Sequence, residues 1–96
     1  MNPEFTESKY RPVHELKTWQ PYYRDVKNKL KKFELRYNDR NFKVGDLLCL
    51  KEYNPDTKEY TGEECFALIT YILTGFTGIE PGYVILSINL VEDIQS

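Results

Sequence analysis

The spacing of apolar residues changes at Lys32 from a helical repeat to a strand repeat, and this change most constrains the fold. Upstream, four apolar or aromatic residues recur every three or four positions and predict an α-helix over residues 19–30. They are Trp19, Tyr23, Val26 and Leu30. Downstream, Phe33, Leu35 and Tyr37 alternate with charged residues. This alternation predicts a half-buried β-strand whose apolar side chains face the core.

Three further strand-like runs follow, and one short alternating run precedes the helix. These runs span residues 13–17, 47–53, 64–73 and 83–90. One helix cannot cover both faces of a flat five-stranded sheet, so we expect the sheet to curl into a small barrel. The predicted fold is α+β, with a β-barrel of five or six mainly antiparallel strands and one main helix.

The length of the chain fits one domain. Its 96 residues permit a single hydrophobic core. We place the domain at residues 13–96, behind a polar N-terminal arm over residues 1–12. No apolar run exceeds five residues, and the arm lacks the apolar stretch of a signal peptide. We therefore expect a cytoplasmic, monomeric protein that does not enter a membrane.

The formal charge of −2 conceals an uneven distribution. Residues 1–43 carry 11 basic and 6 acidic side chains, whereas residues 44–96 carry 2 basic and 9 acidic ones. The first half would attract a polyanion and the second half would repel it. The alternative is that the two halves neutralise each other within one small fold.

The cysteines and the single histidine predict no metal site and no cofactor. Cys49 and Cys65 stand among apolar residues, as buried reduced thiols do. The turn over residues 54–58 places them on adjacent antiparallel strands. His14 can serve as an acid or base, or as a hydrogen-bonding packing residue. One histidine with two separated cysteines does not form a common zinc site.

The most informative candidates for a site lie around the predicted strand at residues 32–38. Glu34 and Arg36 project from the same face of that strand, about 7 Å apart. They can flank a ligand, since arginine presents a planar fork of donors and the carboxylate accepts. The alternative is a solvated ion pair on the surface. Residues 74–82 contain three glycines and a proline, which predicts a loop that can serve as a lid.

Three strings in this chain are typical of one family. They are His14–Lys17 (HELK), Lys31–Asp46 (KKFELRYNDRNFKVGD) and Gly82–Ile88 (GYVILSI). With them the chain resembles, over nearly all of residues 13–90, an uncharacterised bacterial and phage domain family of the ASCH group (activating-signal-cointegrator homology) in the PUA-like superfamily. The resemblance implies a PUA-like β-barrel with a helix at one end, which binds RNA or a nucleotide. The ligand-binding residues that we expect are His14, Lys17, Lys31, Glu34, Arg36 and Asn38.

One type of ASCH relative is a small amidohydrolase that acts on acetylated cytidine. Lys31 and Arg36 match its motif, but Glu34 occupies the position of its threonine and Lys29 that of a glycine. A carboxylate cannot replace a hydroxyl nucleophile by the same route, so we assign no catalytic residue. The resemblance leaves three hypotheses: an RNA- or nucleotide-binding module, an amidohydrolase-like enzyme on a modified nucleoside, and a protein-interaction accessory domain.

Overall fold

Five strands and one short helix make up the part of the chain that the computed structural model describes, residues 12–92. In chain order they are β1 (Val13–Trp19), α2 (Gln20–Lys27), β2 (Phe33–Tyr37), β3 (Leu47–Asn54), β4 (Glu59–Thr74) and β5 (Tyr83–Val91). The expected strands and helix are all present, and the fold is α+β. The arm expected over residues 1–12 lies outside the described residues except for Pro12.

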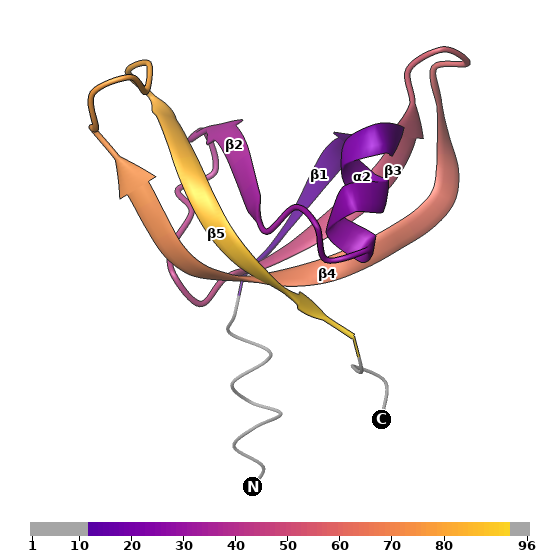
Figure 1. Cartoon of the computed structure of the whole chain (residues 1–96), viewed down its shortest axis with the longest axis horizontal. Coiled ribbons are helices and arrows are strands. Elements are labelled where there is room, and N and C mark those ends of the chain that lie inside the picture. Colours follow the sequence, from indigo (N-terminus) through magenta and orange to yellow (C-terminus); the bar gives the residue numbers. More distant parts are fainter. Residues whose placement is uncertain (1–11, 93–96) are drawn as a thin grey trace, which may run out of the picture.

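The strands form one curled sheet in the order β1-β3-β4-β5-β2. β1 pairs with β3 in parallel, and the other three pairs are antiparallel. Figure 1 shows the sheet bent into an open trough, with α2 lying on the side formed by β1 and β3. β1 and β2 are the two edges of the sheet, and no ladder joins them among residues 12–92. The predicted barrel is therefore a half-barrel with one open seam.

The core lies on the concave face of this sheet, beneath α2. It consists of Leu16, Tyr23, Val26, Phe42, Leu48, Leu50, Cys65, Ala67, Ile69, Val84, Leu86 and Ile88. Every second residue of β3, β4 and β5 points inward, as expected for strands with one buried face. Tyr23 and Val26 of α2 cover these strands, so the predicted buried stripe of the helix is confirmed for its two central members.

The helix is shorter than the predicted range of 19–30. Trp19 is the last residue of β1, and Pro21 stands in the first helical turn, where no N–H donor is needed. The helix ends at Lys27, and Lys29 adopts a left-handed conformation with φ 63°. Leu30 follows this reversal and is exposed. Leu30 therefore keeps the spacing of the helical stripe although the backbone has already left the helix.

The prediction for the two faces of β2 is wrong. Phe33, Leu35 and Tyr37 are between 48% and 57% exposed, whereas Glu34 is only 3% exposed. The strand thus turns its charged residues towards the interior and its apolar residues outward. Glu34 tolerates this position because two cationic side chains neutralise it, as described below. Alternation located the strand correctly, but hydrophobicity assigned its faces the wrong way round.

The two cysteines lie on adjacent antiparallel strands, as predicted, and both are buried and free. Leu50 stands directly opposite Cys65, and Cys49 stands opposite Phe66. Because neighbouring residues of a strand point to opposite faces, Cys49 and Cys65 lie on opposite sides of the sheet. The register therefore keeps the two thiols apart. No helix among residues 12–92 is long and apolar enough to span a bilayer.

Candidate ligand-binding groove

A buried carboxylate between two cations forms the centre of the candidate site. Lys31 Nζ lies 2.7 Å from Glu34 Oε2. Arg36 Nε and Nη2 lie 2.9 and 2.8 Å from Glu34 Oε1. Both carboxylate oxygens are thereby occupied, which compensates the cost of removing this charge from water. The cluster follows from the chain itself, since Glu34 and Arg36 share one face of β2 and Lys31 immediately precedes the strand.

The same arginine joins the two edges of the sheet. Arg36 Nη2 donates to the carbonyl oxygen of Lys17 at 3.1 Å and to Thr18 Oγ1 at 3.3 Å. Further along, Arg40 Nη1 donates to the carbonyl oxygen of Glu15 at 2.8 Å. The guanidinium groups of Arg36 in β2 and of Arg40 just after it therefore connect this part of the chain to β1, where no backbone ladder does. The open seam is held at a fixed width by side chains.

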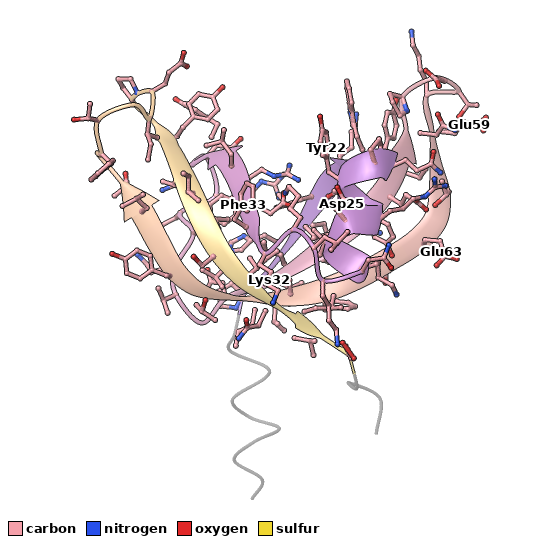
Figure 2. All side chains as sticks on the ribbon, in the orientation of Figure 1. Tyr22, Asp25, Lys32, Phe33, Glu59 and Glu63 are labelled. Carbon is pink, nitrogen blue, oxygen red and sulfur yellow. The ribbon has the colours of Figure 1, made fainter. Side chains whose placement is uncertain are left out.

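A groove of about 530 Å³ opens at this seam. Its lining comprises Lys17, Thr18, Trp19, Tyr22, Lys31, Phe33, Glu34, Leu35 and Arg36. Figure 2 shows Tyr22 on the α2 side and Phe33 on the β2 side of the opening. The rings of Trp19, Tyr22 and Phe33 are each about half exposed. The groove thus combines exposed aromatic walls with a charged floor.

The charges of the groove favour an anion. Lys17, Lys31 and Arg36 are cationic, and Glu34 is the one carboxylate among the lining residues. The ammonium group of Lys17 lies 4.2 Å from the ring centroid of Tyr53, and that of Lys31 lies 4.8 Å from the ring centroid of Phe33. Such contacts hold the cations beside aromatic faces. The groove therefore suits a ligand that has both a flat ring and a negative group.

The edge of β2 that faces the seam also offers backbone groups. The carbonyl of Lys32 accepts from the Ile88 amide, and the amide of Asn38 donates to the Gly82 carbonyl, so even-numbered residues of this strand bond to β5. In an antiparallel pair the intervening residues turn their N–H and C=O groups away from the partner. Leu35, which lines the groove, therefore directs its backbone groups to the free edge of the sheet.

Four of the six expected ligand-binding residues meet in this groove, namely Lys17, Lys31, Glu34 and Arg36. His14 and Asn38 lie elsewhere. His14 Nε2 is 2.8 Å from Asp46 Oδ2, and its ring packs edge-on against Phe42. Asn38 Oδ1 accepts a hydrogen bond from the Phe42 amide. Both side chains thus hold the segment between β2 and β3 in place.

The loop predicted over residues 74–82, expected as a lid, contributes no side chain to the groove. Sequence reasoning also left Trp19 and Tyr22 out of the site. The sequence did indicate that Tyr22 is exposed, because an aromatic residue that lies outside the buried stripe of a helix must face solvent. Thr18 gave no signal. It is buried, and its hydroxyl donates to the carbonyl oxygen of Leu16 at 3.3 Å.

Within residues 12–92, no three histidine, cysteine, aspartate or glutamate side chains gather as a metal-binding group. No curated protein matches the chain. The family model DUF3850, a domain of unknown function, matches residues 13–88 and so includes every residue that lines the groove. The chain therefore belongs to the DUF3850 family.

Proposed function

We propose that this protein is an RNA- or nucleotide-binding module of the ASCH type in the PUA-like superfamily. The observation that carries the proposal is the groove at the seam, where aromatic walls stand above a cationic floor. Stacking of a base on aromatic rings, with lysine or arginine on the phosphate, is the usual mode by which proteins hold unpaired nucleotides. A base between Tyr22 and Phe33 would bring its phosphate towards Lys17 and Lys31.

The dimensions and the charge of the molecule favour a short ligand. A volume of about 530 Å³ falls in the range of small-molecule pockets and fits one nucleotide unit. The isoelectric point of 5.4 is far from that of a general polyanion binder. Figure 2 shows acidic side chains, among them Glu59 and Glu63, on and below the hairpin between β3 and β4. A long duplex would meet these carboxylates, whereas a ligand confined to the seam would not.

The chain carries its own reporter for this proposal, because Trp19 is its one tryptophan and lines the groove. We expect saturable quenching of Trp19 fluorescence when single-stranded RNA or a nucleotide is added at low salt. Lys17→Ala should weaken binding at least several-fold, because it removes an exposed cation of the groove without disturbing the core. Tyr22→Ala should do the same by removing a stacking surface, worth about 1–3 kcal/mol per base.

Lys58→Ala is the matched control, since Lys58 is an exposed lysine in the hairpin between β3 and β4, outside the groove. This variant should bind RNA or a nucleotide with the affinity of the unmodified protein. Absence of quenching by any nucleotide or RNA would refute the proposal and favour a protein-interaction domain. Release of a carboxylic acid from an N4-acylated cytidine by the protein would instead favour the amidohydrolase-like alternative.

A further inference from the structure

A second, smaller pocket adjoins the groove on the far side of Lys31. It has a volume of about 300 Å³ and lies where the end of α2 meets β5. Its lining comprises Val26, Lys29, Lys31, Lys32, Ile88, Asn89, Leu90 and Glu92. Lys31 lines both cavities, so the two cavities are neighbours at this side chain.

Three lysines converge on this pocket, and they differ in how they are paired. Lys29 contacts Glu92, with 2.5 Å between Nζ and Oε2. Lys31 contacts Glu34 and the carbonyl oxygen of Phe33. Lys32 is exposed and forms no ion pair within residues 12–92, so its charge is available to a ligand. Figure 2 shows Lys32 beside β5, next to the segment that joins α2 to β2.

The backbone that presents these lysines is ordered by hydrogen bonds. The carbonyl oxygen of Asp25 accepts from the amides of Leu30 and Lys31 at 2.8 and 3.0 Å, and the Lys29 amide donates to Val26 at 3.0 Å. On the far side, the carbonyl oxygen of Lys32 accepts from the Ile88 amide at 3.0 Å. The three cations therefore project from a fixed turn, which reduces the ordering cost when an anion binds.

We infer that this pocket binds the second phosphate of a single-stranded nucleic acid whose first base occupies the groove. An ammonium group has three donors, and Lys31 uses two of them on Phe33 and Glu34. Its third N–H remains for the phosphodiester that links the two nucleotides, and Lys32 takes the next phosphate. This inference rests on the proposed function and narrows it, because the ligand is then an oligonucleotide and not a free nucleotide.

The test compares the ribonucleoside 5′-monophosphates with a ribotrinucleotide of mixed sequence, both followed through Trp19 quenching. The trinucleotide should bind at least tenfold more tightly. Lys32→Ala should remove most of this advantage, leave the affinity for monophosphates unchanged, and reduce the salt slope for the trinucleotide by about 0.7. Glu92→Gln should strengthen trinucleotide binding, because it removes the carboxylate of the pocket. Lys58→Ala should match the unmodified protein in every titration.

The failures of the two proposals are distinguishable. Equal affinity for monophosphates and the trinucleotide, or an equal loss of both in Lys32→Ala, would overturn the second-phosphate site and leave nucleotide binding in the groove intact. If neither ligand quenches Trp19, the proposed function falls and the inference falls with it. Because Lys32 is exposed, its variant should keep the thermal unfolding midpoint of the parent, which confirms that affinities are compared between folded proteins.

Discussion

Glu34 shows how one carboxylate links the site to the stability of the fold. Its two oxygens are bonded to Lys31 and Arg36, and Arg36 continues to β1 through the Lys17 carbonyl. Removal of one partner from a buried ionic cluster leaves a charge without compensation, which costs more than the loss of a surface ion pair. Glu34 and Arg36, which line the groove, are therefore structural residues as well.

The substitution Arg36→Ala should lower the free energy of unfolding by about 1–3 kcal/mol, since it leaves the buried carboxylate of Glu34 with one cationic partner in place of two. Adding Glu34→Gln should recover part of this loss, because the buried charge is then absent. Urea unfolding of both single variants and the double variant gives the coupling free energy. Simple additivity of the two single effects would show that the cluster is not coupled.

Lys29 is strained, because a lysine at φ 63° brings its Cβ close to the backbone. Glycine adopts this conformation at no steric cost and commonly follows the end of a helix. We expect Lys29→Gly to raise the free energy of unfolding by about 0.5–1 kcal/mol, because the steric cost that it relieves exceeds the extra entropy that glycine loses on folding. Lys29→Ala is the control, since it loses the contact with Glu92 but keeps the strain. Thermal unfolding of both separates the two effects, and a less stable Lys29→Gly would contradict the argument.

At the scale of the element, β2 shows the limit of periodicity. Alternation located the strand at residues 32–38, close to the observed Phe33–Tyr37. Alternation could not indicate which face of β2 is buried, because this depends on whether the charge of Glu34 is paired by residues elsewhere in the chain. Lys31 is local to Glu34, but the acceptors of Arg36 on β1 are 18 and 19 residues away. The same distance in sequence hid Thr18 and Trp19 from the predicted site.

The other elements were easier to predict because their signals are local. The turn at residues 54–58 and the apolar runs of β3, β4 and β5 are each visible within a short stretch of sequence. The predicted strands match the observed ones closely, except that β4 begins at Glu59 and not at residue 64. The parallel pairing of β1 with β3 was not predicted, since it joins strands separated by the helix and β2. Four of the six predicted site residues line the groove, because they belong to one charged face and its immediate neighbours.

The reversed faces of β2 predict opposite outcomes for two leucines on neighbouring strands. Leu35 is more than half exposed on β2, whereas Leu86 of β5 is fully buried and stands opposite Glu34. Leu35→Ala should change the free energy of unfolding by no more than about 0.5 kcal/mol. Leu86→Ala should lower it by about 2–5 kcal/mol through the cavity that it leaves. Chemical unfolding measures both, and a large loss in Leu35→Ala would contradict the assigned faces.

For the whole molecule, three buried acids couple folding to alkaline pH. Burial raises the pKa of Tyr23 and of Cys65, and it raises the pKa of Cys49 from 9.0 to about 11, with help from Glu64. The folded protein therefore keeps protons that the unfolded chain releases. The contribution of Cys49 to stability is complete below its ordinary pKa of 9.0 and is lost as pH rises towards 11.

We accordingly expect the urea midpoint of unfolding to stay constant from pH 7 until the pH approaches 9.0 and then to fall. Cys49→Ala should flatten the decline, since one of the three groups is then absent. Thiol-reactive reagents should label the folded protein slowly at neutral pH and label two thiols per chain once it is unfolded. A midpoint that is independent of pH up to 11 would contradict this assignment.

The unclosed seam also bears on how the site could diversify. Arg36 and Arg40 span the gap between the sheet edges with their side chains, so the length of a side chain sets the width of the opening. A closed barrel would need a change in strand number or stagger to alter its bore. Here a shorter residue in place of Arg40 would remove one of these spans without removing a hydrogen bond from any ladder of the sheet. The width of the seam is thus set by side chains and not by the ladders of the sheet.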